Sequence, residues 1–260
     1  MAVVGAILGD IAGSQYEFHR PEGLDFHHCE LFTERCRFTD DTVMTLAVKK
    51  AILEKKDLTD TMREIGQLYP DSGYGGNFYY WMFGERPKPY NSFGNGSAMR
   101  VSFVGEYFQD ISEVIHAAEK TALVSHNHPE GVKGAVVTAV CIWMAKNGKS
   151  RQEIYDYVLT QYPPADYEFS IDKDMEYLRK HYRWNETCMG SVPAAMRCFY
   201  DSDSFETFMR NVFSFDCDSD TLGAIGGAVA EEFYHGVGFD AEPILKKYLD
   251  ERLYTLSREA

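Results

Sequence analysis

The sequence predicts an all-α fold, a compact helical bundle that forms a single domain over residues 1–260. Apolar residues recur at i, i+3, i+4 and i+7 over most of the chain, as in the segment Val43, Met44, Ala47, Val48, Ala51 and Ile52. Strand signals are weak, because residues 71–78 and 87–96 are rich in Gly, Pro, Asn and aromatic residues and are predicted as ordered loops. No Gly/Ser linker, low-complexity tract or repeat divides the chain, so one domain is expected.

Glycine spacing predicts where two of the helices lie. Gly5, Gly9 and Gly13 recur every four residues and would share one face of an N-terminal helix. Residues 221–230 are similarly rich in Gly and Ala. Each glycine costs a helix about 0.5–1 kcal/mol, so these stripes predict two tightly packed central neighbours. The other amphipathic segments expected to be helical are 111–124, 131–146, 150–161, 192–201, 204–213, 221–235 and 241–255.

Composition limits the classes of partner and the compartment. The 260-residue chain carries 40 acidic and 26 basic residues, a formal net charge of −14, which disfavours general binding to nucleic acid. Six cysteines without CxxC spacing predict free thiols in a reducing compartment. The apolar N-terminus lacks a basic leader and is interrupted by Asp10, and no run reaches the roughly 18–20 apolar residues of a membrane span. A cytoplasmic protein is therefore expected.

Two acidic clusters precede apolar helices. Thr39-Asp40-Asp41-Thr42 and Asp218-Ser219-Asp220-Thr221 each combine two carboxylates with hydroxyls. Helix capping is one explanation, but a cap requires a single oxygen. The alternative is a site for Mg²⁺, Mn²⁺ or Ca²⁺, which prefer such hard oxygen ligands. If the two helix starts face each other, enough ligands converge for two cations, which could bind a vicinal diol or phosphate oxygens and activate water. These ligands are Thr39, Asp40, Asp41, Asp218, Asp220 and Thr221.

Glu17 is a third candidate acid, flanked by Tyr16 and Phe18 near a predicted helix end. Apolar surroundings would raise the pKa of its carboxyl group and suit it to acid–base chemistry. The alternative is an exposed glutamate at a helix terminus.

Five motifs, in order, carry a resemblance to a known family: GDIAGSQYEF, TDDTVMTLA, FGNGSAMRV, SHNHPEGVKGA and DSDTLGAIGGAVA. Together they cover the chain from about residue 5 to about residue 236, and the chain resembles the ADP-ribosylglycohydrolase family. The resemblance implies an all-α fold with a binuclear Mg²⁺ or Mn²⁺ site in a central cleft. It also implies a hydrolase that cleaves the C1″ glycosidic bond between ADP-ribose and an acceptor, with ADP-ribose or an ADP-ribosylated substrate as the partner.

The resemblance also implies roles for individual residues. The six cluster residues above would hold the metals, with Asp220 bridging. Glu17, or a metal-held carboxylate such as Asp41 or Asp220, would activate water. His126 would face the substrate ribose, although a lone histidine is often structural. Tyr74 and Phe93 are equally compatible with adenine stacking and core packing. The loop that would line the ADP-ribose site, unless it is only a turn, contains Gly94, Asn95, Gly96, Ser97 and Met99.

The chain departs from the family at Asp216 and Cys217, which stand where two glycines are usual. The change could distort the site, or Asp216 could add a ligand. It motivates an alternative function, a catalytically impaired ADP-ribose-binding or immunity module. A third possibility is a helical metalloprotein that acts on another phosphorylated or glycosidic substrate. Arginine, serine, a nucleic-acid base, O-acetyl-ADP-ribose and small molecules are all compatible acceptors, and the sequence indicates no particular oligomeric state.

Overall fold

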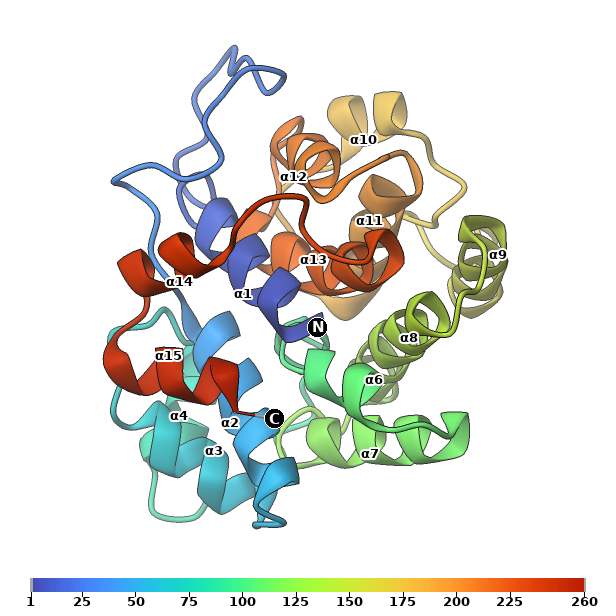
Figure 1. The fold of residues 1–260 in the computed structure, drawn as a ribbon. Helices are drawn as coiled ribbons and strands as arrows, with labels where there is room; N and C mark the ends of the chain where they lie inside the picture. Colours follow the sequence, from blue (N-terminus) through green and yellow to red (C-terminus); the bar gives the residue numbers. More distant parts are fainter. Residues whose placement is uncertain (1, 260) are drawn as a thin grey trace.

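Helices α1 and α13 form the centre of the structure, and the other helices pack around them (Figure 1). The computed structural model describes residues 2–259, and within this range it contains helices and one isolated bridge but no β-strand. The prediction of an all-α, single-domain fold is confirmed. The helices are α1 (Ala2–Gly13), α2 (Asp40–Leu53), α3 (Leu58–Gly66), α4 (Gly76–Phe83), α5 (Gly96–Met99), α6 (Ser102–Tyr107), α7 (Ile111–Leu123), α8 (Pro129–Lys146), α9 (Arg151–Gln161), α10 (Met175–His181), α11 (Cys188–Tyr200), α12 (Phe205–Phe213), α13 (Ser219–Tyr234), α14 (Glu242–Tyr248) and α15 (Glu251–Arg258).

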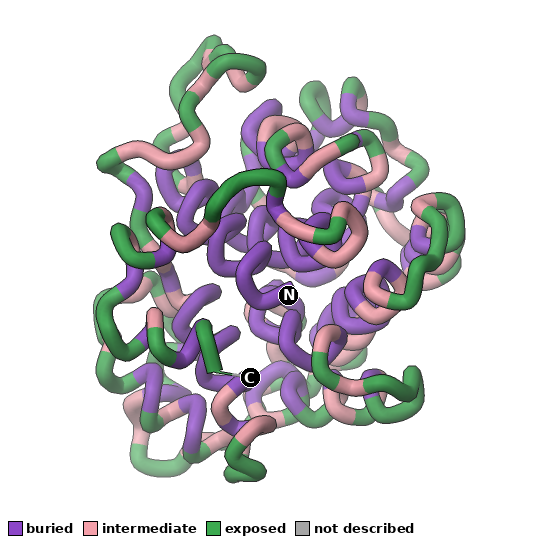
Figure 2. The backbone as a smooth tube through the Cα atoms, in the orientation of Figure 1, coloured by how far each residue is buried: buried purple, intermediate pink, exposed green. Residues whose placement is uncertain are grey.

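The glycine stripes bring the backbones of α1 and α13 into contact. A Cβ atom added to Gly9 would lie 2.0 Å from the carbonyl oxygen of Gly223, and one added to Gly5 would lie 2.3 Å from that of Gly227. The residue pairs run in opposite directions along the two helices, so the helices are antiparallel. Every residue of α1 is buried, and Figure 2 shows α1 and α13 as the buried centre of the molecule. The prediction that these two helices are close neighbours is confirmed.

Helix α13 also packs against α8, α11 and α12, while α2 packs against α1 and α3. This arrangement places the N-terminal ends of α2 and α13 on either side of the C-terminal end of α1. The segments that carry the two acidic clusters therefore meet beside the residues that follow α1.

Two local predictions were wrong. Residues 241–255 form two helices and not one, because Leu249 is extended and Asp250 caps α15 by accepting a hydrogen bond from the backbone N–H of Leu253. The loop expected over 71–78 ends early, because α4 begins at Gly76, where aromatic residues supply a face that packs inward. The sequence reasoning also missed α3, α5, α6 and α10, each of which has nine residues or fewer. Short helices show too few turns for a clear period.

We expect Gly9→Ala to lower the free energy of unfolding by about 3 kcal/mol, the upper end of the usual cost of overpacking. The added methyl group would meet backbone at 2.0 Å, and backbone cannot swing aside as a flexible side chain can. Chemical denaturation measures the change. Gly76→Ala is the matched control, because apart from its chain neighbours and the nearby backbone of its own helix no atom of the described residues lies within 4 Å of its added Cβ. Equal losses in the two variants would contradict the close backbone approach.

Candidate functional site

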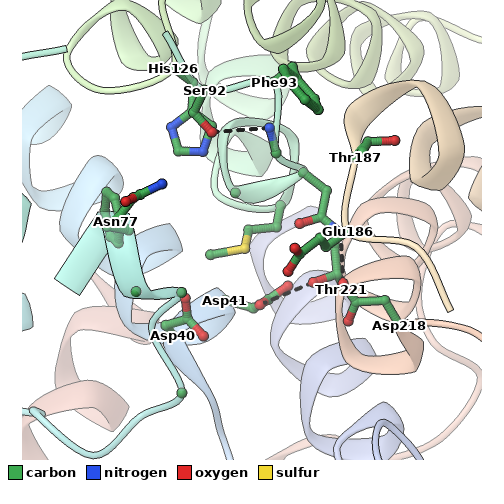
Figure 3. A pocket seen from close by; sticks show the side chains of 18 of the residues that line it. Asp40, Asp41, Asn77, Ser92, Phe93, His126, Glu186, Thr187, Asp218 and Thr221 are labelled. Atoms are coloured by element: carbon green, nitrogen blue, oxygen red, sulfur yellow. Dashed lines mark hydrogen bonds between the residues drawn. The ribbon is translucent and has the colours of Figure 1, made fainter. Parts of the chain in front are cut away.

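A cleft of about 510 Å³ opens where the N-terminal ends of α2, α4, α5 and α13 meet the segment after α1. Six carboxyl groups and one buried guanidinium group line it, so acidic residues dominate its lining. Figure 3 shows Asp40 and Asp41 facing Asp218 and Thr221 at one end of the cleft, with His126 and Phe93 toward the other. The charged residues that line the cleft are Glu17, Asp40, Asp41, Arg100, Glu186, Asp218 and Asp220.

The second acidic cluster lies directly against Glu17. Glu17, Asp218 and Asp220 each place a carboxylate oxygen within 4.8 Å of the other two. Asp218 is the N-cap residue of α13, but its side chain makes no capping hydrogen bond. Its Oδ2 instead accepts a 2.7 Å hydrogen bond from Asn95 Nδ2. Capping therefore does not explain why Asp218 is present. The carboxylate oxygens of Asp218 and Asp220 suit a cation, and Glu17 adjoins them.

The first acidic cluster lies across the cleft from the second. Thr39 caps α2, since its hydroxyl oxygen accepts from the backbone N–H of Asp41. The two clusters touch where the Thr221 hydroxyl lies 3.4 Å from Asp41 Oδ2 (Figure 3). Asp41 Oδ1 is buried and has no hydrogen-bond partner among the described residues. A buried carboxylate oxygen without a partner is costly, and a bound cation would satisfy it.

Asp10 holds the first cluster in place. This residue is fully buried in α1, and its Oδ2 accepts from the backbone N–H groups of Thr39 and Thr42 at 3.0 and 3.1 Å. The Thr39 hydroxyl donates to Asp10 Oδ1 at 2.7 Å, and the Thr42 hydroxyl donates to Oδ2. A charged acceptor at a helix N-terminus is favourable. Asp10 therefore ties the start of α2 to α1. The sequence alone indicates Asp10 only as an interruption of an apolar run.

Burial raises the pKa values of the clustered carboxyl groups, and mutual repulsion adds to the effect. Burial followed by the charge of Asp220 raises the pKa of Glu17 to about 9. Burial followed by the charge of Asp10 raises that of Asp40 to about 8. The pKa values of Asp41 and Asp220 lie well above the ordinary range, because burial dominates, followed by the charge of Asp220 for Asp41 and the charge of Asp218 for Asp220. Such a cluster fits divalent cations, which would replace the missing countercharge.

The glycine-rich loop, residues 94–99, packs against residues 186–188 and forms one wall of the cleft. Two backbone hydrogen bonds join the segments: Asn95 N–H donates to Glu186 O at 2.8 Å, and Cys188 N–H donates to Phe93 O at 2.9 Å. Gly94, Asn95, Gly96 and Met99 line the cleft.

Not every predicted site residue lines the cleft. Ser97 is buried beneath the glycine-rich loop and donates to Gly131 O at 2.7 Å. Thr39 lies below the surface of the cleft beside Asp10. Of the two predicted aromatic residues, Phe93 lines the cleft and is 44% exposed, whereas Tyr74 does not line it and its hydroxyl donates to Gly66 O. Phe93 is thus available for stacking, whereas Tyr74 is half-buried and packs against the core.

His126 lies in the wall of the cleft beside the glycine-rich loop. Its ring is almost fully buried, and burial followed by the positive charge of Arg100 holds its pKa well below the ordinary value. A Cβ atom on Gly96 would lie 3.1 Å from His126 Nε2. Glycine at position 96 therefore leaves room for the imidazole edge that faces the cleft.

The departure at residues 216–217 leaves the geometry of the second cluster intact. Asp216 is exposed and is absent from the lining of the cleft, so it adds no ligand there. Cys217 is buried, and its thiol donates to Val212 O at 3.4 Å. Neither residue has a positive φ. Cys217 therefore fills core volume where a glycine would leave a gap. All six cysteines, which lie within residues 2–259, are free, as predicted.

Several lining residues had no signal in the sequence. Phe18 is 64% exposed and Trp184 is 40% exposed, and their ring centroids lie 6.0 Å apart at the cleft. Glu186 lies beside them in the lining, and Asn77 and Tyr90 belong to it as well. Only the exposure of large aromatic residues in the folded chain marks this rim as a binding surface.

Comparison with known proteins agrees with the site. A model of the ADP-ribosylglycohydrolase family matches residues 1–230. The human ADP-ribosylhydrolase ARH3 is 25% identical over 313 residues, covering 93% of this chain and 85% of that protein. The mouse ADP-ribosylhydrolase ARH3 is also 25% identical, over 89% of this chain and 82% of its own length. A solved structure titled ADP-ribosylglycohydrolase-related protein complex superimposes with a TM-score of 0.76 at 20% identity, covering 98% of this chain and 94% of its own.

The chain belongs to the ADP-ribosylglycohydrolase family, a family of hydrolases. The predicted resemblance is confirmed. Within residues 2–259, no helix combines the length and apolar character that crossing a bilayer requires.

The raised pKa values predict how pH changes stability. An acid with a raised pKa binds more protons in the folded chain than in the unfolded chain between the ordinary and the raised value. The free energy of unfolding of the metal-free protein should therefore fall as pH rises from about the ordinary Asp value of 3.8 toward the value of about 9 for Glu17. Mg²⁺ or Mn²⁺ should raise the melting temperature more at pH 8 than at pH 5, because ionised carboxylates bind cations.

Scanning calorimetry at both pH values, with EDTA or with metal, measures this difference. Asp220→Asn should remove most of the metal-dependent shift at pH 8. Asp216→Asn, four residues away and exposed, is the matched control and should keep it. If metal stabilised the protein equally at both pH values, the clustered carboxyl groups would not be its ligands.

Proposed function

We propose that this protein is a divalent-cation-dependent hydrolase that cleaves the C1″ glycosidic bond between ADP-ribose and an acceptor. The observation that carries the proposal is the convergence of Glu17, Asp218 and Asp220 within 4.8 Å, facing the unpartnered Asp41 Oδ1 across one cleft. Membership of the ADP-ribosylglycohydrolase family supports the same reaction class. We also propose that one domain spans residues 1–260.

The proposed metal ligands are Thr39, Asp40, Asp41, Asp218, Asp220 and Thr221, and the ions are two Mg²⁺ or Mn²⁺ ions. Hard oxygen donors without sulfur or imidazole favour these ions over zinc. When bound, the cations would supply Lewis-acid charge that orients the hydroxyls of the distal ribose and stabilises developing negative charge. A diphosphate would be repelled by a cleft lined with six carboxyl groups and one guanidinium. Substrate binding should therefore depend on the cations.

Glu17 is the proposed proton carrier. Its carboxyl group adjoins Asp218 and Asp220 and is only half-buried, so it lies beside the proposed cation site and is accessible to water. Hydrolysis forms a bond between the water oxygen and C1″ and breaks the bond from C1″ to the acceptor, through an oxocarbenium-like state. A Glu17 oxygen accepts a proton from the water and then passes it to the departing acceptor, which leaves protonated while Glu17 returns to its starting state. Asp41 and Asp220 would hold the cations, whose positive charge would support the reaction.

The glycine-rich loop and Phe93 are the proposed binding wall for the rest of ADP-ribose. Gly96 has no side chain, and its backbone N–H, which has no hydrogen-bond partner among the described residues, is open to a phosphate oxygen. The backbone N–H of Gly94 instead donates to Ser92 Oγ at 3.1 Å. Asn95 acts differently: its amide nitrogen donates to Asp218 Oδ2 and to Ser191 Oγ at 2.9 Å. It thus orients a proposed metal ligand from within the substrate loop. Ser97 supports the loop from beneath, and the exposed ring of Phe93 suits stacking on adenine.

Release of ADP-ribose from arginine-, serine- and nucleotide-linked substrates tests the function and identifies the acceptor. The assay is run with Mg²⁺, with Mn²⁺ and with EDTA. Metal-dependent release from one linkage is the expected result. Calorimetric binding of ADP-ribose without release from any substrate would instead favour the binding or immunity module. If the protein retained cations but did not bind ADP-ribose, the result would favour a metalloprotein that acts on another substrate.

We expect Asp41→Asn and Asp220→Asn each to lower kcat/KM at least ~100-fold, because each removes a charged ligand and leaves a buried amide in its place. The measurement is steady-state hydrolysis of the substrate found above. Asp216→Asn is again the control and should retain wild-type rates. Wild-type activity in either cluster variant would rule out the proposed centre.

Glu17→Gln separates binding from chemistry. The amide cannot accept the proton of water, so kcat should fall by ~100-fold or more. The dissociation constant for ADP-ribose in the presence of metal should change by less than about threefold, since Glu17 is not among the proposed metal or substrate ligands. Loss of binding in parallel with loss of kcat would show that Glu17 is a ligand and not the proton carrier.

A further inference from the structure

Arg100, Ser125 and His126 form a buried chain of hydrogen bonds at one end of the cleft. Arg100 and Ser125 have no exposed surface, and His126 is 4% exposed. Arg100 Nη2 donates to Ser125 Oγ at 2.9 Å and to Thr121 O at 2.7 Å. Ser125 Oγ lies 2.7 Å from His126 Nδ1. Neither Arg100 nor Ser125 is among the residues that the proposed function uses.

The donors and acceptors in this chain fix its direction. A guanidinium group has no acceptor, so Ser125 Oγ accepts from Arg100. The single hydroxyl hydrogen of Ser125 then has one acceptor among the described residues, His126 Nδ1. If Nδ1 carried a proton, the buried hydroxyl hydrogen would have no partner, at a cost that folded proteins usually avoid. Nδ1 is therefore unprotonated, and the ring hydrogen of a neutral imidazole lies on Nε2.

The charge of Arg100 keeps the ring neutral. A histidine beside an acidic cleft would ordinarily gain a proton, since opposite charges nearby favour the charged form. Here burial disfavours the imidazolium form, and the guanidinium of Arg100 disfavours it further. Arg100 itself stays charged without an ion-pair partner in the described chain, and its ring contact is with Phe78, 5.5 Å away.

The other edge of the imidazole faces the cleft. Nε2 would lie 3.1 Å from a Cβ on Gly96 and 3.6 Å from one on Gly94, and all three residues line the cleft. The hydrogen bond recorded for this ring among the described residues is at Nδ1. The Nε2–H group is therefore available to a ligand held against the glycine-rich loop.

We infer that Arg100 and Ser125 are positioning residues that hold His126 as its neutral Nε2–H tautomer, so that Nε2 donates a hydrogen bond to an oxygen of bound ADP-ribose. The identity of the ligand rests on the proposed function. The tautomer rests only on the hydrogen bonds within the chain.

Nitrogen NMR of protein with ¹⁵N-labelled histidine tests the tautomer without any substrate. A His126→Gln spectrum identifies the resonances of His126. In the wild type, Nδ1 should appear as the unprotonated nitrogen and Nε2 as the protonated one. Ser125→Ala should abolish this fixed pattern and give averaged resonances. Ser102→Ala is the matched control, because Ser102 is a buried serine whose hydroxyl has no partner in the described residues.

A second measurement tests the role of Nε2–H. Titration with ADP-ribose in the presence of metal should shift the Nε2 proton resonance of the wild type. Ser125→Ala should weaken ADP-ribose binding about fivefold, the value of one neutral hydrogen bond, with KM raised and kcat nearly unchanged. If Ser125 had only a structural role, Ser125→Ala would lower the melting temperature without raising KM selectively over kcat. Ser102→Ala measures the size of such a purely structural effect.

A protonated Nδ1 in the wild type, or a Ser125→Ala variant with unchanged resonances and unchanged affinity, would overturn the inference. Failure of the proposed function gives a different result: the wild type would show the fixed tautomer but neither bind ADP-ribose nor hydrolyse its conjugates. That result would overturn the assigned ligand along with the proposed function.

Discussion

The contact between the backbones of α1 and α13 is the constraint on which the site depends. Because Gly9 and Gly223 allow the two helices to touch, the end of α1 lies beside the start of α13. Glu17 follows α1 and thereby reaches Asp218 and Asp220. Small residues in a helix cost local stability, and here that cost is offset by close packing that larger side chains would prevent. The glycine stripes are therefore as necessary to the site as its carboxylates.

The clustered carboxyl groups of the cleft destabilise the folded, metal-free protein. Several carboxyl groups are buried together, their pKa values rise, and Asp41 Oδ1 has no partner in the described chain. Functional sites often retain such unfavourable arrangements because the ligand resolves them. Divalent cations would supply the missing charge and also prepare the cleft for an anionic ligand. Stability and substrate binding would then depend on the same ions.

Several residues that do not contact the proposed cations or substrate orient the residues that would. Asp10 ties the start of α2 to α1, and Asn95 links the glycine-rich loop to Asp218. Arg100, through Ser125, sets the hydrogen-bonding state of His126. Each of the three depends on a buried hydrogen bond between segments distant in sequence, Asp10 to Thr39, Asn95 to Asp218 and Arg100 to Ser125. Such links fix geometry more than they add stability, because on folding each of them replaces hydrogen bonds that the same groups made to water.

The sequence by itself determined the helical fold, the central pair of helices and the two acidic clusters, because period, glycine spacing and adjacent carboxylates are local properties of a chain. It also indicated Glu17 and the glycine-rich loop, though not that Ser97 faces away from the cleft. Only the tertiary structure decided that the clusters meet, that Asp216 is left outside, and that Arg100 lies behind His126. Those outcomes depend on distances between segments far apart in the chain, and such distances are set by how helices pack and not by the residues next to each other.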